Sequence, residues 1–226
     1  MAKCLVLLAE QRFVMIIGAS GGGKSSLVFA GMLPEVRAGF VRARCGSWAV
    51  ATFRPERSPL RNLAQALATV LRLPSISIVE TELKYGFAAL VELYKTSSLC
   101  PASSPPGLTP AEERRQQRGA ANLLLETTWL AWAGGLPIYI VCTMHSDFVG
   151  QCAEFRGLIE QVGASQYFVL RLVRHEFLAV IQEPALLSGN RISERLVQRL
   201  LYDIGHGQDQ LPVLQHALRR IWLAVD

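Results

Sequence analysis

The residues with the clearest chemical potential form a short glycine-rich segment. Residues 18–25 read Gly-Ala-Ser-Gly-Gly-Gly-Lys-Ser, which matches the pattern G-x-x-x-x-G-K-[ST]. Glycines allow consecutive backbone N–H groups to turn inward around phosphate oxygens, because no Cβ blocks the approach. Lys24 adds a full positive charge, and the hydroxyl of Ser25 is suited to coordinate Mg²⁺. The segment therefore predicts a phosphate-binding loop for a nucleoside triphosphate.

The hydroxyl of the next residue, Ser26, is expected to reach the α-phosphate. The candidate nucleotide-binding residues of this segment are Gly18, Ala19, Ser20, Gly21, Gly22, Gly23, Lys24, Ser25 and Ser26. Ser25 is also the candidate metal ligand. The residues alone assign no catalytic role.

The flanking sequence has the order that such a loop requires. Phe13–Ile17 is an apolar run rich in β-branched residues, typical of a strand buried on both faces of a parallel sheet. Residues 25–33 have helical spacing, and Pro34 is expected to end that helix. A buried strand before the loop and an amphipathic helix after it favour a functional loop over a chance glycine-rich turn.

The rest of the chain alternates between strand and helix patterns. The expected strands after the first are Trp48–Phe53, Ile138–Thr143 and Tyr167–Leu172. The expected helices between them cover residues 58–71, with Ser58 as cap and Pro59 at the first position, and residues 82–95, 109–133 and 155–162. The Ser- and Pro-rich stretch 97–110 is expected to be a loop. This alternation predicts an α/β fold with a doubly wound parallel sheet.

Three helical segments without strands close the chain, at about 174–187, 193–203 and 211–225. We therefore expect a nucleotide-binding domain over residues 1–172 and a small helical module over residues 173–226, the latter incomplete.

Composition and charge bear on the partners and the location to be expected. The 226 residues carry a net charge of +5, but Lys and Arg are scattered, so we expect no DNA or RNA partner. The longest apolar region, 123–142, contains Glu126, a Gly-Gly pair and Pro137, so no membrane-spanning helix is expected. No secretion signal is visible. Five widely spaced cysteines without a Cys-x-x-Cys pair favour a reducing, cytoplasmic location.

Several further stretches, in order, resemble the nucleotide-binding module of the novel STAND NTPases, which are signal-transduction P-loop ATPases. They are residues 18–28 with Gly31-Met-Leu-Pro34, Phe53-Arg-Pro55 with Pro59-Leu60, Leu136–Val141 with Thr143–Phe148, Gln166-Tyr167, Glu183-Pro-Ala185, Leu196–Leu201 and Asp209–Leu218 with Trp222. The resemblance covers nearly the whole chain. It implies a P-loop NTPase fold, ATP and Mg²⁺ as ligands, and a protein partner or self-association that reads the nucleotide state.

The resemblance also implies a role for Pro212, because a proline in this helical region can lie against the adenine ring. The alternative is a proline that only fixes φ in the first turn of a helix. Two other residues have such alternatives. His145 stands where relatives usually place an arginine near the nucleotide, and Asp147 is expected to help order the site. Either could equally be an ordinary loop residue.

The sequence departs from the family where hydrolysis is concerned. Relatives have an apolar strand that ends in acidic residues, Walker B, near the stretch Cys100–Pro110, and no such strand is found there. Leu123-Leu-Leu-Glu126 is the apolar run ending in an acid nearby, and its context favours a helix. Without those acids, hydrolysis is expected to be weak or absent. A missing strand is also expected to leave a gap in the sheet.

The ends of the chain differ from relatives as well. Only twelve residues precede Phe13, so the pocket for the base is expected to be incomplete, and the chain stops just after the Trp222 helix. These features suggest a fragment or a truncated product.

Three hypotheses follow. The first is an ATP-binding switch module with little or no hydrolysis. The second is a scaffold that keeps the fold without nucleotide. The third is a GTPase or phosphotransferase: Asp147-Phe-Val-Gly150 matches D-x-x-G, but no Asn-Lys-x-Asp motif is present.

Overall fold

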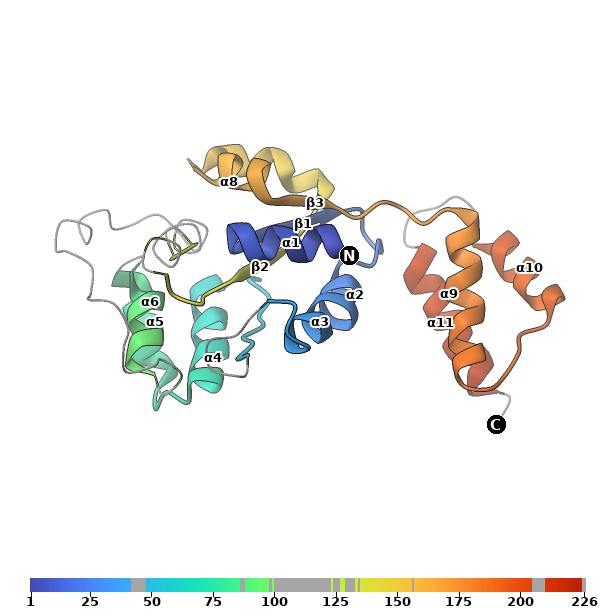
Figure 1. The fold of residues 1–226 in the computed structure, drawn as a ribbon, viewed down its shortest axis with the longest axis horizontal. Coiled ribbons are helices and arrows are strands. Elements are labelled where there is room, and N and C mark those ends of the chain that lie inside the picture. The colour runs from blue at the N-terminus through green and yellow to red at the C-terminus, as the bar shows by residue number, and fades with distance from the viewer. Residues whose placement is uncertain are drawn as a thin grey trace.

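The computed structural model describes residues 1–41, 48–85, 88–97, 99, 123, 127–128, 133, 135–155, 157–204 and 210–224. The described elements form an α/β structure with a small parallel sheet and a group of helices at the C-terminal end (Figure 1). The α/β class and the parallel sheet are confirmed. No helix in the described ranges combines the length and apolar character needed to cross a bilayer.

The sheet contains three described strands in the order β2-β1-β3, with β1 in the centre and parallel to both neighbours. They are β1 (Phe13–Gly18), β2 (Ile140–His145) and β3 (Gln166–Phe168). This sheet is smaller than the doubly wound arrangement expected from the sequence. Among the described strands, β1 pairs directly with both β2 and β3.

Every residue of β1 is buried, which explains its continuous apolar sequence. Val14 and Ile16 face a core made with helix α1 (Ala2–Gln11) and the helical stretch after the glycine-rich loop. Phe13, Met15 and Ile17 face the opposite core, made with helix α8 (Leu158–Ser165) and the preceding 3₁₀ helix η3 (Ser146–Glu154). Helices therefore cover both faces of the central strand.

Helix α1 was not expected from the sequence. It buries Cys4, Leu5 and Leu8 against the sheet, and the Cys4 Sγ lies 3.3 Å from the Sδ of Met32. Burial raises the pKa of the Cys4 thiol, so this sulfur acts as an apolar packing group.

The helix after the loop does not end at Pro34, as the sequence suggested. It runs without interruption through α2 (Lys24–Ser26), a π-helical turn η1 (Leu27–Met32) and α3 (Leu33–Arg37). In the wider π turn the N–H of Leu33 bonds to the carbonyl of Val28. A proline lacks the N–H of a regular turn and clashes with the carbonyl four residues earlier, and the wider turn accommodates both defects.

The predicted strand Trp48–Phe53 is wrong, because these residues have no regular secondary structure. Their apolar side chains pack against other elements. The Trp48 ring meets the edge of Tyr139 with centroids 5.2 Å apart, and Phe53 packs against the helices that follow. An apolar, β-branched run fits a half-buried surface whether or not a strand lies alongside to pair with it.

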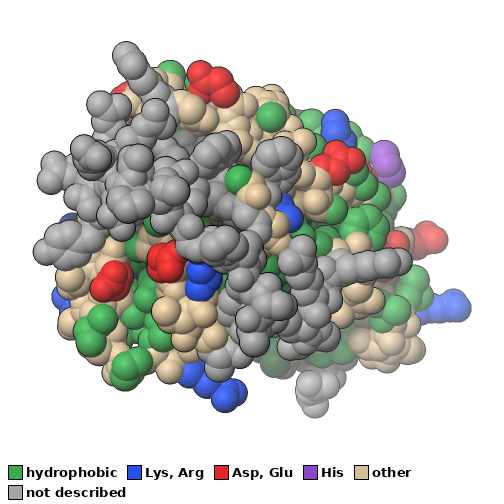
Figure 2. All heavy atoms as spheres, turned by 60° about the vertical axis from the view of Figure 1, so that its left-hand side comes forward, with side chains coloured by type: hydrophobic (Ala, Val, Ile, Leu, Met, Phe, Trp, Pro, Cys, Tyr) green, Lys and Arg blue, Asp and Glu red, His purple; other side chains and the backbone are tan. Residues whose placement is uncertain are grey.

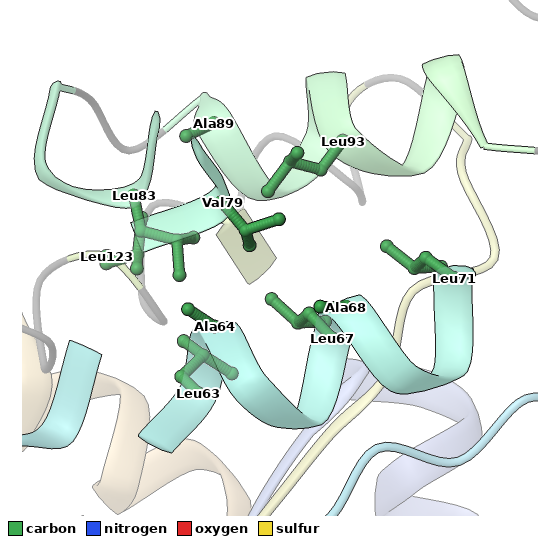
Figure 3. Close-up of a cluster of buried hydrophobic side chains, with 10 residues drawn as sticks. All are labelled: Leu63, Ala64, Leu67, Ala68, Leu71, Val79, Leu83, Ala89, Leu93 and Leu123. Carbon is green, nitrogen blue, oxygen red and sulfur yellow. The ribbon is translucent and has the colours of Figure 1, made fainter. Parts of the chain in front are cut away.

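Those helices are α4 (Pro59–Leu71), α5 (Ile76–Tyr85) and α6 (Ala89–Thr96). Leu63, Leu67 and Leu71 form a buried stripe along α4. Figure 3 shows these side chains directed toward α5 and α6. The single helix expected over 82–95 is instead α5 and α6, and α5 begins earlier.

Other boundaries shift by a few residues. Helix α8 starts at Leu158 rather than Phe155 because η3 precedes it, and β3 is shorter than the expected strand 167–172. Of the expected helix 109–133, only Leu123, Thr127, Thr128 and Ala133 lie within the described residues, and all of them are helical. The hydroxyl of Thr127 donates to the carbonyl of Leu123 at 2.7 Å, as expected of a helix. The rest of that segment and the Cys100–Pro110 stretch lie outside the described residues.

The last three helices match the sequence prediction closely. They are α9 (Arg174–Leu187), α10 (Glu194–Asp203) and α11 (Gln210–Trp222), and the side chain of Ser193 caps α10. Together they bury a core of their own, formed by Phe177, Ile181, Val197, Leu201 and Leu214. Figure 1 shows them to one side of the sheet, joined to β3 by an extended segment. We call α9, α10 and α11 the C-terminal helices.

The burial of β1 yields a stability prediction. Ile16 is fully buried in the central strand, so Ile16→Ala is expected to lower the free energy of unfolding by about 2–5 kcal/mol. The matched control is Ile78→Ala, because Ile78 is 59% exposed on α5 and its truncation is expected to cost less than about 1 kcal/mol. Urea denaturation of both variants measures the difference. Equal losses would contradict the central place of β1 in the core.

Candidate functional site

The carboxyl ends of the three strands meet at one edge of the sheet. Gly18, the last residue of β1, lies beside His145, the last residue of β2. On the other side the N–H of Val169 donates to the carbonyl of Ile17 at 2.7 Å. Ligands of open parallel sheets bind outside this edge, and the glycine-rich loop leaves β1 there.

The loop after Gly18 has a conformation that needs its glycines. Gly21 and Gly23 have φ values of 64° and 82°, in the left-handed region that a Cβ disfavours. The N–H of Gly22 donates to the carbonyl of Ala19 at 3.2 Å, which closes the bend. A Cβ on Gly18 would lie 3.1 Å from the carbonyl oxygen of Val169, so the start of the loop also has little space. The bend is thus closed, as a phosphate-binding loop requires.

The Lys24 side chain folds back over this bend. Its Nζ donates to the carbonyl oxygens of Gly18, at 3.0 Å, and Ala19, at 2.7 Å. An ammonium group has three N–H donors, and no acceptor for the third is found within the described residues. The cation is therefore fixed at the start of the loop and has one N–H left for an anion.

Ser25 and Ser26 follow in the first turn of the helix, and both are exposed. The first N–H groups of a helix have no intrahelical acceptor, and they carry its partial positive charge. The Ser25 hydroxyl is open to solvent and could serve as one oxygen ligand of Mg²⁺. Mg²⁺ commonly takes few protein ligands and completes its shell with phosphate and water. No cluster of three or more His, Cys, Asp or Glu residues suited to a metal occurs within the described residues.

His145 and Asp147 lie just beyond the end of β2. The Nδ1 of His145 accepts a hydrogen bond from the backbone N–H of Asp147 at 3.3 Å, and it is 3.4 Å from the Oδ2 of the same residue. The His145 ring packs edge-on against Phe148, with centroids 5.9 Å apart. These contacts hold the imidazole against Asp147 and Phe148, while the Asp147 side chain remains 77% exposed. His145 thus has local partners that an ordinary loop histidine would also have.

Pro212 lies in the first turn of α11 and is exposed. Its neighbour Leu211 reaches the loop: the Leu211 Cδ1 is 3.4 Å from the place a Cβ on Gly23 would take. The first turn of α11 therefore comes next to the loop although the two are far apart in the sequence.

The structure thus brings together Gly18 to Ser26, His145 and the first turn of α11 around one edge of the sheet. No sequence pattern indicated that Val169 and Leu211 lie close to the loop. Both residues have the apolar character of ordinary core positions, and no local pattern distinguishes them.

The comparison with protein families agrees with this geometry. A family model described as nSTAND1, Novel STAND NTPase 1, matches residues 1–226. Neither a search of curated proteins nor a search of solved structures gave a match. The match to the family model includes the glycine-rich loop, all three described strands and the C-terminal helices. From its sequence and its fold, the chain belongs to the Novel STAND NTPase 1 family.

Proposed function

We propose that this chain is an ATP-binding switch module of signal transduction, with weak or absent hydrolysis. The observation that carries the proposal is the Lys24 ammonium, held by two loop carbonyls at the carboxyl edge of a parallel sheet. A scaffold that binds no nucleotide requires neither a glycine-rich bend directly after a buried strand nor a lysine side chain folded over that bend. Family membership supports the same reading.

In this proposal the segment Gly18 to Gly23 surrounds the phosphates with backbone N–H groups other than that of Gly22, which closes the bend. Lys24 neutralises the phosphate charge, and Ser25 is the protein ligand of Mg²⁺. Ser26 reaches the α-phosphate, and Pro212 lies against the adenine ring. The position of Leu211 supports the last assignment, because its Cδ1 lies 3.4 Å from where a Cβ on Gly23 would stand, which puts the first turn of α11 close to the loop. ATP is preferred to GTP because the sequence has no Asn-Lys-x-Asp motif.

We propose two functional units, residues 1–172 for the nucleotide and residues 173–226 for the response. A protein partner or a second copy reads the state of the chain in the cytoplasm, and nucleic acid has no part. The scattered charge supports the last point: Figure 2 shows acidic and basic side chains interspersed among apolar ones on the described part of one face.

Slow or absent hydrolysis follows from the sequence, which has no recognisable Walker B strand to orient water. We expect phosphate release well below about 1 s⁻¹, the lower end of ordinary enzyme turnover. A malachite-green assay with Mg²⁺ and ATP measures it. Turnover in the ordinary range would show that another acid takes the role of Walker B, and Asp147→Asn would test the acid that follows β2.

Removal of the loop cation tests ATP binding directly. For the unmodified chain, Mg²⁺-ATP at 100 times its dissociation constant is expected to add about 2.7 kcal/mol of stability, seen as a higher melting temperature. Lys24→Ala is expected to lose most of that increase, because the anion loses its charged partner.

The matched control is Lys84→Ala, because Lys84 lies on α5 in an exposed ion pair with Glu80. This variant is expected to keep the full ATP response. If ATP does not raise the melting temperature of the unmodified chain, the scaffold hypothesis replaces this one. A stronger response to GTP than to ATP in the same assay would favour the GTPase hypothesis.

The tight start of the loop gives a second test. Gly18→Ala places a methyl group 3.1 Å from the Val169 carbonyl oxygen and 3.5 Å from the Lys24 Cγ. Because backbone atoms must move, we expect weaker ATP binding, by about tenfold, together with some loss of stability.

Gly163→Ala is the control for the glycine-to-alanine change. Gly163 lies inside α8 with no atom within 4 Å of an added Cβ, so alanine is expected to stabilise the helix by about 0.5–1 kcal/mol. Its ATP affinity is expected to stay unchanged. Titration with a fluorescent ATP analogue compares the two variants, and equal affinities would argue against a site at the start of the loop.

A further inference from the structure

His145 lies at the start of the glycine-rich loop although it belongs to another strand. In the pairing of β1 with β2 its Cα stands opposite that of Gly18, and paired strands are about 4.7–4.9 Å apart. Val14 and Val141, which are paired in the same way, face the core that contains the helix after the loop. Because side chains alternate along a strand, His145 lies on that face as well. It is therefore on the side of the sheet where the loop turns into its helix.

The imidazole of His145 has one nitrogen held and one free. Its Nδ1 accepts a hydrogen bond from the backbone N–H of Asp147 at 3.3 Å. In this state Nδ1 carries no proton, so the ring is neutral and its proton is on Nε2. No hydrogen-bond partner of Nε2 is found within the described residues, and the His145 side chain is 28% exposed. The ring is therefore accessible to a second proton from water.

A second proton on the ring changes its local partner. A charged imidazole has two N–H donors and no acceptor, so the bond from the Asp147 N–H is lost. The Oδ2 of Asp147 already lies 3.4 Å from Nδ1 and is placed to accept the new N–H in an ion pair. The neutral and the charged ring thus hold the segment after β2 through different atoms of the same residue.

Two charged groups of the described chain lie near the ring. Asp147, on η3, supplies a carboxylate that is 77% exposed, so water screens its charge. Lys24, on α2, has its ammonium at the carbonyl oxygens of Gly18 and Ala19. Strand β1 contributes no titratable side chain. A charged His145 therefore adds a second cation to the edge that holds Lys24, and repulsion between the two favours the neutral ring until an anion arrives.

We propose that His145 makes phosphate binding at the loop sensitive to pH, with the charged ring as the form that binds the nucleotide more tightly. The inference rests on the proposed function, because it takes ATP as the ligand of the loop. Histidine side chains change their charge between about pH 5 and 8. Bound phosphates favour the charged ring, and by linkage the charged ring favours bound phosphates by the same factor. The affinity therefore rises as the pH falls through this range, and binding takes up protons.

The pH dependence of ATP affinity in variants of His145 tests this switch. The unmodified chain is expected to bind ATP about fivefold more tightly at pH 6 than at pH 8, the lower end of typical coupling between sites. His145→Gln has no titratable ring and is expected to lose this rise. His145→Arg carries a permanent charge, so it is expected to bind tightly at both pH values. Titration with Mg²⁺ and a fluorescent ATP analogue measures the affinities. The terminal phosphate of the nucleotide titrates equally with every variant, so the difference between variants isolates His145.

The matched control is His175→Gln, because His175 is an exposed histidine in the first turn of α9. This variant is expected to keep the pH dependence of the unmodified chain. Calorimetry of ATP binding in buffers of different ionisation enthalpy adds a readout that a purely structural role of His145 does not move. At pH 7 the unmodified chain and His175→Gln are expected to take up more protons on binding than His145→Gln.

Melting temperatures without nucleotide show whether His145→Gln remains folded. If it does not, Asp147→Asn provides the comparison. It keeps the backbone N–H that holds the neutral ring and removes the carboxylate that pairs with the charged one. Its rise in affinity is expected at lower pH than in the unmodified chain, and an unchanged profile would contradict the switch.

The outcomes separate the switch from the proposed function. If ATP binds the unmodified chain at neither pH, both fail. If ATP binds with the same pH dependence in the unmodified chain and in His145→Gln, the ATP module stands and the switch is overturned. A larger rise at low pH in His145→Gln than in the unmodified chain also overturns it, because the charged ring then opposes binding.

Discussion

The ion–dipole contact of Lys24 with the first carbonyls of the loop is the interaction on which the rest of the site depends. A lysine side chain is long and loses considerable rotamer freedom when it is held in one place. Here the carbonyl oxygens of Gly18 and Ala19 hold its ammonium group, so that cost is met before any ligand arrives. A phosphate that enters the loop meets a positive charge that is already positioned. Such preorganisation favours binding more than the charge alone.

The loop can hold this geometry because β1 is rigid. All six residues of β1 are buried, with helices on both faces and a parallel strand on either side. Gly18 therefore cannot move far, and the bend begins from a fixed point. The π turn in the following helix serves the same end, since it lets the helix continue past Pro34 and keep Met32 and Val36 in the core. A rigid strand before the loop and a packed helix after it leave the bend little freedom of its own.

The C-terminal helices relate to this rigid part in a different way. Their core is separate, and the segment that joins them to β3 exposes apolar side chains. Parts with separate cores are expected to move relative to each other unless a large apolar interface joins them. This arrangement suits the switch module proposed above.

Helices and strands were predicted correctly where the local sequence alone specifies them. The boundaries of α9 and α10 were predicted to within a residue. Helix α10 is amphipathic and has a serine cap, and α9 buries Phe177, Ile181 and Ala185 at helical spacing. Strand β1 was also predicted correctly, because a continuous apolar run that leads into glycines is typical of a buried parallel strand. The strand predicted for Trp48–Phe53 was wrong, because its apolar composition indicates burial but does not show that another strand pairs with it. Helix α1 was missed because a short apolar run before a strand does not show which structure it adopts.

The sequence by itself determined the family, the loop and its charged residue, because a lysine and serine after spaced glycines are encoded in consecutive positions. Only the tertiary structure decided which residues surround that loop. Val169, His145 and Leu211 come from segments that are more than a hundred residues away, and their types are those of ordinary strand, loop and helix positions. The parallel pairing of β1 with its neighbours and the packing of α11 bring them to one edge. No local pattern records such distant contacts, because they depend on how the whole chain packs.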